Sequence, residues 1–567
     1  MKSGRLPLDR LTWRRWRSAV RAFTTSEVGG RAKTLFAALL ALLIAINGLN
    51  VVNNYVGRDF MTAIEERSMS RFVAKTLLYI GVFGASTVAA VIYRFTEERL
   101  GLLWREWLTR RLVTRYLQTG TYYWLREQAE LANPDQRIAD DVRSFTTTTL
   151  SLTLVLLNTT FTIVAFSGVM WSISPLLFFA AVLYAALGSG LTVLFGRPLI
   201  WLNYDQADRE ASLRADLVHV REHADSVAML RREGRLGERI QRRVGDLVEN
   251  TKRIIAVNRN LGFFTTGYNY LIQIIPIVIV APLFIRGQAQ FGVISQSSMA
   301  FSHLLGAFSL IITQFQQISS YAVVLARLSA LAEGVDRVAT SGTAGIEIDD
   351  SGTDLVWNHL TLRSPHDGRV LVDDLSVSVS PGTRALVTGP SDAGRSALFR
   401  ATAGLWHSGE GRITRPPPDA ILFIPERPYL PPGTLREALV RTGSEARVGD
   451  ARILEVLRAL GIETVVGRTK GLDVEHEWDD LLSLGEQQQL AFARVVLAAP
   501  RFALLDHPAT LIGADAVLRA LALLTRGGIT TITFAPDTQL AEEHDVLVEL
   551  SHNGTWIRRP VHEEPAA

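Results

Sequence analysis

The chain has 567 residues, of which 48 % are hydrophobic, and its formal net charge is +3. This length predicts at least two domains, because single hydrophobic cores stop growing well before it. The nearly balanced charge argues against a nucleic-acid-binding protein, and the sequence contains no cysteine for disulfides or thiolate-bound metals.

The N-terminal segment, residues 1–30, has the pattern of a helix that lies on a membrane surface. Trp13, Trp16, Val20 and Phe23 recur at helical spacing, and arginines fill the opposite face. Aromatic and arginine side chains suit the headgroup level of a bilayer. The first long apolar run follows at once, and it is too late and too long for the apolar region of a cleavable signal peptide.

Residues 31–332 are predicted to form an α-helical membrane domain with six spans. Each apolar segment is long enough to cross about 30 Å of hydrocarbon, which takes roughly 20 helical residues. The predicted spans are 34–54, 76–95, 150–173, 175–197, 262–285 and 296–322. Two long stretches rich in arginine and glutamate, 96–149 and 198–261, have helical periodicity. We expect them to be membrane helices that continue into the cytoplasm and return.

The loops also indicate an orientation. Short loops alternate with the long charged stretches, and the basic N-terminus lies on the side of the long ones. By the positive-inside rule, that side is cytoplasmic. We therefore expect both termini in the cytoplasm and the spans in the cytoplasmic (inner) membrane of a bacterium, in contact with its lipids.

Polar side chains interrupt the predicted spans. They are Asn47, Asn50, Asn54, Asn158, Asn269, Gln273, Gln314 and Gln317. Taken singly, each is best explained by a hydrogen bond between helices, worth about 0.6 kcal/mol on average. Taken together, they favour a polar path for a hydrophilic solute. Full charges are missing from the span centres, so the sequence shows no obvious intramembrane proton relay.

A second domain, residues 354–555, follows a linker at 333–353 that is rich in Gly, Ser, Thr and Asp, and residues 556–567 are predicted to be a tail. Two strand-like runs, Val370–Val379 and Arg384–Thr388, lead into a glycine-rich loop and then a helix. The loop consists of Gly389, Pro390, Ser391, Asp392, Ala393, Gly394, Arg395 and Ser396. A strand, such a loop and a helix in this order form a phosphate-binding site.

A further anion-binding element is predicted within residues 482–507. The run of Ser483, Leu484, Gly485, Glu486 and Gln487 opens a helix, whose N-terminus offers free N–H groups and a positive dipole end. Pro500 closes this helix, and an apolar strand from Phe502 ends in Asp506. A carboxylate at the end of a buried strand suits a Mg2+ ligand.

These motifs resemble those of the ATP-binding-cassette (ABC) transporters, with an exporter-type six-helix membrane domain and an α/β P-loop nucleotide-binding domain. Residues 389–396 look like the Walker A loop, 483–487 like the signature and 502–506 like the Walker B strand. Local runs look like the bacterial SbmA/BacA-type and the peroxisomal acyl-CoA (subfamily D) transporters. These runs are Arg58-Asp59-Phe60, residues 104–111, Tyr122-Tyr123, residues 133–139 and residues 217–224.

The resemblance also implies a coupling turn. In that family a turn like that of Asn133, Asp135, Gln136 and Arg137 lies at the tip of the first intracellular loop and docks on the nucleotide-binding domain. The chemistry fits, because Asn-Pro stops the preceding helix and Asp caps the next.

The resemblance implies ATP and Mg2+ as ligands, but several positions depart from the family's pattern. Arg395 stands in place of the phosphate-contacting Lys and Asp392 in place of a Gly, while Glu426 replaces the Gln that senses Mg2+. His507 replaces the catalytic Glu, and Pro536 replaces the switch His. The candidate Mg2+ ligands are Ser396, Asp506 and Glu426. We expect weak ATP and Mg2+ binding and deficient hydrolysis, although a neutral histidine could act as a substitute base.

The signature, in contrast, is intact. In the resembling family two nucleotide-binding domains dimerise head to tail, so each ATP lies between one Walker A loop and the partner's signature. We therefore expect a half-transporter that completes the ATP site of a second half-transporter and moves a peptide, cobalamin-like or drug-like solute. One alternative is a proton-driven, SbmA/BacA-like uptake homodimer with an inactive cassette, and another is a non-transporting membrane scaffold. The sequence selects neither the solute nor the direction of transport.

Overall fold

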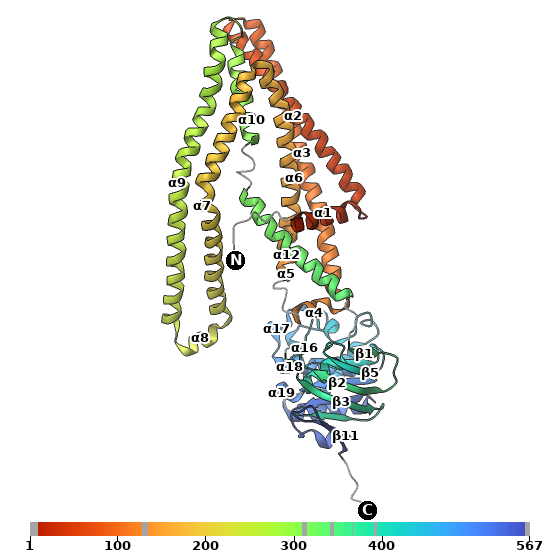
Figure 1. Cartoon of the computed structure of the whole chain (residues 1–567). Coiled ribbons are helices and arrows are strands. Elements are labelled where there is room, and N and C mark those ends of the chain that lie inside the picture. Colours follow the sequence, from red (N-terminus) through yellow and green to blue (C-terminus); the bar gives the residue numbers. More distant parts are fainter. Residues whose placement is uncertain are drawn as a thin grey trace, which may run out of the picture. The chain divides into compact units, whose positions relative to one another are not determined.

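The computed structural model describes residues 10–127, 134–308, 315–340, 345–365, 367–389 and 394–561. The chain divides into two compact units, Met1–Thr340 and Ser341–Ala567. The first unit is helical and the second is an α/β domain, which confirms the predicted fold class (Figure 1). The segment 333–353, expected to be a linker, contains the end of one helix and a short strand.

The helical unit consists of long helices joined by short turns. Its elements are α1 (Arg10–Thr24), α2 (Gly29–Glu65), α3 (Met69–Leu117), η1 (Gln118–Gly120), α4 (Thr121–Glu127), α5 (Pro134–Gln136), the π-helical turn η2 (Arg137–Asp141), α6 (Val142–Ile173), α7 (Pro175–Glu222), α8 (Ala224–Leu230), α9 (Glu233–Ile285), α10 (Gly292–Phe308) and α12 (Phe315–Thr340). Within the described residues, five helical segments are long and apolar enough to span a membrane: Gly29–Glu65, Met69–Leu117, Pro134–Ile173, Pro175–Glu222 and Glu233–Ile285. The sixth predicted span, 296–322, is divided between α10 and α12, and residues 309–314 lie outside the described residues.

The boundary between α6 and α7 follows from local sequence. Ser174 is extended, with φ −162° and ψ 122°, and Pro175 begins the next helix. Proline is favoured at this position, because the first turn of a helix needs no N–H donor and proline has none. From there α7 continues without a break through the charged stretch to α8, and α9 returns beside it (Figure 1). The charged stretch 198–261 is therefore helical, as its periodicity predicts.

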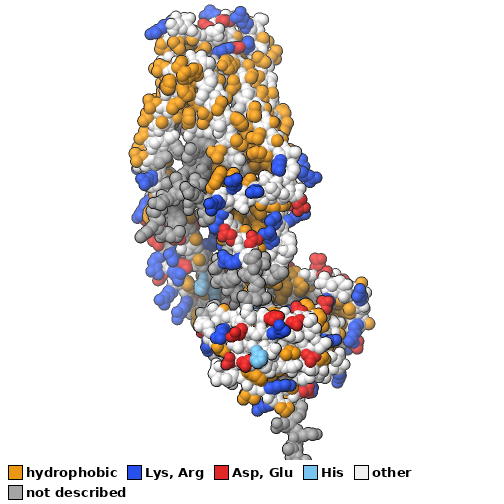
Figure 2. Space-filling view, turned by 45° about the vertical axis from the view of Figure 1, so that its right-hand side comes forward, with side chains coloured by type: hydrophobic (Ala, Val, Ile, Leu, Met, Phe, Trp, Pro, Cys, Tyr) orange, Lys and Arg blue, Asp and Glu red, His pale blue; other side chains and the backbone are white. Residues whose placement is uncertain are grey.

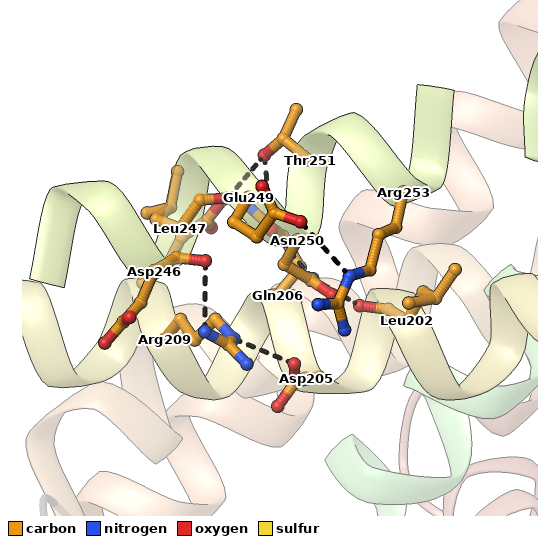
Figure 3. A network of polar contacts seen from close by, with 11 residues as sticks. Leu202, Asp205, Gln206, Arg209, Asp246, Leu247, Glu249, Asn250, Thr251 and Arg253 are labelled. Carbon is orange, nitrogen blue, oxygen red and sulfur yellow. Dashed lines mark hydrogen bonds and ion pairs between the residues drawn. The ribbon is translucent and has the colours of Figure 1, made fainter. Parts of the chain in front are cut away.

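Polar contacts hold α7 and α9 together in this charged stretch (Figure 3). Asn250 is 2 % exposed and donates from Nδ2 to the Leu202 carbonyl and to Gln206 Oε1, both at 3.0 Å. Arg209 donates to the Asp246 carbonyl at 3.0 Å. These contacts fix the register of the two helices, because a buried polar group that loses its partner costs about 1–3 kcal/mol.

The surface of the helical unit matches a protein that crosses a bilayer. Large hydrophobic side chains are exposed on several of its helices, among them Leu77, Ile80, Val88, Leu183 and Leu194. Figure 2 shows hydrophobic side chains gathered in a band, with Lys and Arg side chains at both ends of it. Apolar surface between two charged zones is the pattern of a lipid-facing domain.

The α/β unit, called the cassette below, alternates strands and helices. Its strands are β1 (Ile346–Asp349), β2 (Leu355–Arg363), β3 (Val370–Val379), β4 (Ala385–Thr388), β5 (Gly409–Thr414), β6 (Ile421–Ile424), β7 (Gly433–Thr434), β8 (Glu475–His476), β9 (Phe502–Asp506), β10 (Thr530–Ala535), β11 (Val546–Leu550) and β12 (Trp556–Pro560). Its helices are α13 (Gly394–Thr402), α14 (Leu435–Leu439), α15 (Asp450–Ala459), α16 (Thr464–Arg468), α17 (Trp478–Leu481), α18 (Leu484–Ala498), α19 (Ala509–Ile512), α20 (Ala514–Arg526) and η3 (Ala541–Glu543).

In the described part of the cassette, six strands form the central sheet in the order β12-β11-β4-β10-β9-β6. All neighbours are parallel except β12, which pairs antiparallel with β11. A second sheet has the order β1-β5-β2-β3. One core cluster contains Trp357 of β2, Leu398 of α13 and Ile532 of β10, so α13 packs against both sheets. This packing places the first turn of α13 at the carboxyl edge of the central sheet.

Candidate functional site

Four segments that the sequence predicts for one site meet at this carboxyl edge. Gly389 follows β4, Glu426 follows β6, Asp506 ends β9 and Pro536 follows β10. Parallel strands end at the same edge of a sheet, and the register pairs Ala535 with Thr388 and Phe534 with Asp506. The loop residues Pro390, Ser391, Asp392 and Ala393 lie outside the described residues. The other predicted members of the site are brought together.

Two glycines set the start of α13. Gly389 has φ 145°, and a Cβ there would lie 2.6 Å from the Leu550 carbonyl oxygen. A Cβ on Gly394 would lie 2.0 Å from Val372 Cγ2. Only glycine fits such close approaches of backbone and side chain. The helix therefore begins directly against β3, and Arg395 is the first side chain after this contact.

Arg395 is turned into the protein and is only 1 % exposed. Its Nη1 donates to the Gly389 carbonyl at 2.6 Å and to the Ala535 carbonyl at 3.0 Å. Its Nη2 bonds to Nε2 of His507. Burial lowers the pKa of Arg395, and the negative charges of Asp506, Glu426 and Asp537 oppose this shift. The side chain at the phosphate-contacting position is thus bonded to the protein itself.

His507 links Arg395 to Asp506. It has φ 47°, its N–H donates to the Phe534 carbonyl at 2.9 Å, and its Nδ1 lies 2.6 Å from Asp506 Oδ1. A guanidinium can only donate, so Nε2 of His507 must accept and the ring proton must be on Nδ1, donating to Asp506. The lone pair that a general base would use is therefore engaged by Arg395.

The described side chains at this edge do not fit a Mg2+ ion. Asp506 already accepts a hydrogen bond from His507, and the buried charge of Arg395 lies close enough to Asp506 and Glu426 to interact with both. Ser396 is half-buried beside them on α13. Among the described residues, no group of three His, Asp or Glu side chains is arranged to hold a metal ion. A second cation would be repelled by the first.

The signature segment, unlike the Walker residues, forms a regular and exposed helix N-terminus. Ser483 caps α18: its Oγ accepts from the Glu486 N–H at 3.3 Å, and the Glu486 carboxylate accepts from the Ser483 N–H at 2.9 Å. Arg468 also donates to Glu486. Burial by itself would raise the pKa of Glu486, but the bonds from Ser483 and Arg468 outweigh it and lower the pKa. Ser483 and Leu484 are exposed, so a well-formed helix N-terminus is open to a ligand or partner.

Comparisons with known proteins agree with this fold. Residues 22–285 match the family described as ABC transporter transmembrane region 2, and residues 372–510 match the ABC transporter family. The chain is 35 % identical to an uncharacterized ABC transporter ATP-binding protein of Synechocystis, over 93 % of this chain and 81 % of the relative. It is 33 % identical to ABC transporter D family member 2, chloroplastic, of Arabidopsis thaliana, over 95 % of this chain and 86 % of the relative.

The chain belongs to the ABC transporters, as a half-transporter of subfamily D type. It is also similar to the lysosomal cobalamin transporter ABCD4 of Homo sapiens, at 24 % identity over 92 % of each chain. These relatives support the subfamily D side of the predicted resemblance and give no support to its SbmA/BacA side. The family implies a multi-pass membrane protein that dimerises and binds ATP, typically with Mg2+.

The predicted coupling turn of this half-transporter is only partly described, because Asn133 lies outside the described residues. Asp135 and Gln136 are exposed, as a docking surface requires. Arg137, in contrast, is buried in η2 and donates to the Arg327 carbonyl of α12 at 3.1 Å. Arg327 in turn lies 2.9 Å from Asp141. Arg137 therefore ties the turn to the helix that precedes the cassette, a role that its position in the motif did not indicate.

Several of the predicted path residues bond to one another or to neighbouring helices. Asn47 is buried and donates to Asn158 Oδ1 at 2.9 Å, while Thr162 donates to Asn47 Oδ1 at 2.9 Å. Asn54 is fully buried and donates to the Gln296 carbonyl at 3.0 Å. These two asparagines form hydrogen bonds between helices, which is the role expected for each polar span residue taken by itself.

The remaining predicted path residues differ in exposure. Asn50 is half-buried, whereas Asn269, Gln273 and Gln317 are exposed, and Gln314 lies outside the described residues. The sequence analysis missed His303 of α10, a titratable side chain within a predicted span, which is half-buried and stacks on Phe166 at 4.4 Å between ring centroids. Its position within the predicted span 296–322 was the available signal.

Proposed function

We propose that this half-transporter is the non-hydrolysing subunit of a heterodimer, and that its signature completes the ATP site of a partner with working Walker motifs. The complex moves a hydrophilic or amphipathic solute, of peptide, cobalamin-like or drug-like type, across a bacterial cytoplasmic membrane. Binding of ATP at the chain's own Walker residues is weak, and Asp506 does not hold Mg2+ there. The lysosomal cobalamin transporter among its relatives suggests cobalamin as the first solute to test.

One observation carries this proposal. Of the two segments that contact nucleotide in this family, the Walker residues are bonded to one another, whereas the signature is exposed and well formed. At the Walker end, Arg395 is 1 % exposed and engages the only lone pair of neutral His507. At the signature end, Ser483 is exposed and its capping box is complete. A homodimer would contain two altered Walker ends, so a partner with a working one is favoured.

The first test is ATP turnover by the purified full-length chain in lipid nanodiscs. We expect Mg2+-dependent, vanadate-sensitive turnover to be about 10²–10⁴-fold below that of the native complex, because a general base is missing. Turnover of the chain alone at the rate of the complex would contradict the proposal and favour a working homodimer.

The second test concerns the signature in the complex purified through a tag on this chain. Ser483→Arg places a long cation at the exposed helix N-terminus, and we expect it to abolish solute-stimulated ATP turnover. Thr442→Arg, on an exposed loop of the same cassette, serves as the matched control and leaves turnover unchanged. If Ser483→Arg also left turnover unchanged, the signature would not serve the partner's site.

A proton-driven uptake homodimer remains the second candidate because of His303. His303 is a titratable side chain within a predicted span, and such a side chain is a functional-site candidate. Under this alternative, His303→Gln abolishes solute uptake and a protonophore does the same, while ATP depletion at constant membrane potential has no effect. Uptake that stops on ATP depletion and survives His303→Gln would exclude it.

A further inference from the structure

We infer that Arg395 is the resident cation of the nucleotide-facing edge of the cassette, and that it takes the place of a divalent metal, so that Asp506 does not bind Mg2+. The inference rests on the proposed function, since it explains why the chain's own Walker site is deficient. It goes further by assigning the role of the metal ion's positive charge to the guanidinium of Arg395.

The first argument is the way in which Arg395 is held. The side chain is almost completely buried, and its Nη1 donates hydrogen bonds to two backbone carbonyls. One belongs to Gly389, directly after β4, and the other to Ala535, the last residue of β10. Backbone carbonyls are permanent acceptors, so they stabilise the guanidinium in this position whether or not a ligand is present. Reaching outward to a phosphate would require both bonds to break.

The second argument is charge. Three carboxylates, those of Asp506, Glu426 and Asp537, lie close enough to Arg395 to interact with its charge. Like charges that share a partly buried edge repel each other strongly, so this edge needs a compensating cation. Arg395 supplies it from within the chain, and a metal ion entering the same edge would meet the repulsion of a charge that cannot leave.

The third argument is the role of His507. Its imidazole lies between Arg395 and Asp506 and bonds to both, through Nε2 and Nδ1 respectively. This bridge engages one oxygen of Asp506 with a hydrogen-bond donor, so fewer lone pairs of this carboxylate are left for a metal ion. The substitutions at positions 395 and 507 are thus two halves of one arrangement.

The test is hydrogen exchange of β9 and β10 in the full-length chain in lipid nanodiscs, without nucleotide, in EDTA and in MgCl2. For the wild type we expect the same exchange in both conditions. Arg395→Gln keeps a donor, on a shorter side chain, but removes the charge, and we expect exchange at least about tenfold faster in EDTA. Mg2+ should reverse this acceleration, because it can enter the vacated acidic edge. Arg395→Lys, which keeps the charge, should remain close to the wild type in EDTA.

The matched control is Arg400→Gln, on the exposed face of the same helix, which should behave as the wild type does. Slower exchange of wild-type β9 in Mg2+ would overturn the inference, even if the variants failed to fold. Arg395→Gln with unchanged exchange in EDTA, or with an acceleration that Mg2+ does not reverse, would also overturn it. No nucleotide or partner is present in this experiment, so its outcome does not depend on whether the signature serves a partner. The ATP-turnover test of Ser483→Arg can therefore fail while this inference holds, and the reverse.

Discussion

At the scale of single residues, the altered Walker positions form a bonded group. Arg395 belongs to the Walker A loop, and Asp506 and His507 are neighbours at the end of the Walker B strand. Their side chains are nevertheless joined in one chain of hydrogen bonds. Replacing one member alone therefore leaves another without its partner in a buried place, which costs more than the lost bond. Restoring the family's residue at only one of these positions should not restore the site.

We expect a second buried residue, His544, to make the stability of the cassette depend on pH. His544 is fully buried, with Nδ1 bonded to the Leu540 carbonyl at 2.7 Å and Nε2 bonded to Thr533 Oγ1 at 2.9 Å. Burial lowers the pKa of His544, and the bond to Leu540 and the charges of Asp545 and Glu543 oppose this only in part. The unfolded chain, with an ordinary histidine pKa of about 6.5, binds a proton first as pH falls.

This sign fixes the expected pH response. Stability is fully present above the unfolded pKa and is lost as the pH falls below it, so exchange of β10 should accelerate between about pH 7.5 and about pH 5.5, after correction for intrinsic rates. His544→Asn should weaken this dependence, because the amide can still donate to Leu540 but does not titrate. His552→Asn, at an exposed position, is the control and should keep the wild-type dependence. An unchanged dependence in His544→Asn would assign the effect to other groups.

At the scale of elements, the pairing of α7 with α9 depends on a few buried polar side chains. Asn250 bridges α9 to two positions of α7, and within the span Tyr184 donates to the Tyr268 carbonyl at 2.6 Å while Tyr268 donates to the Tyr184 carbonyl at 3.1 Å. The two rings stack at 4.3 Å. These contacts hold the two antiparallel helices side by side over a length at which hydrophobic packing alone would allow them to slide.

We expect Asn250→Ala to loosen this pair in the charged stretch. The change removes two hydrogen bonds between the helices and leaves Gln206 Oε1 with only the 3.4 Å contact from Thr251, a loss of about 1–3 kcal/mol. Hydrogen exchange of the facing parts of α7 and α9 should therefore accelerate. Asn258→Ala, on an exposed position of the same helix, is the matched control. Equal exchange in the two variants would mean that Asn250 does not hold the pair.

At the scale of the whole molecule, the proposed orientation in the membrane can be tested cleanly, because the chain contains no cysteine. Met229 of α8 and Gln288 in the turn between α9 and α10 are both exposed and lie at opposite ends of α9. In intact cells, a membrane-impermeant maleimide should label Gln288→Cys, whereas Met229→Cys should be labelled only after permeabilisation. Labelling in the reverse order would invert the orientation.

Much of the cassette could be predicted from its sequence, because its signals are local. The strand Val370–Val379 was predicted with the bounds that the structure has, and the apolar run before Asp506 is β9. Hydrophobic length also predicted the helices of the membrane domain that the structure describes, with the sixth span only partly tested. Such features depend on neighbouring residues and their periodicity, which a single sequence contains.

What only the tertiary structure decided is how the altered site residues are bonded. From the sequence, Arg395 was a poor phosphate ligand and His507 a candidate substitute base; the fold brings Ala535, 140 residues from Arg395, and His507, 112 residues away, into contact with one guanidinium. The sheet register determines these contacts, and no local pattern encodes them. Arg137 is a similar case, since its acceptor on α12 is 190 residues away. The sequence pattern identified the residues of the candidate site. Their hydrogen-bond partners depend on the tertiary structure, because a buried charge must bond to the groups that the fold places around it.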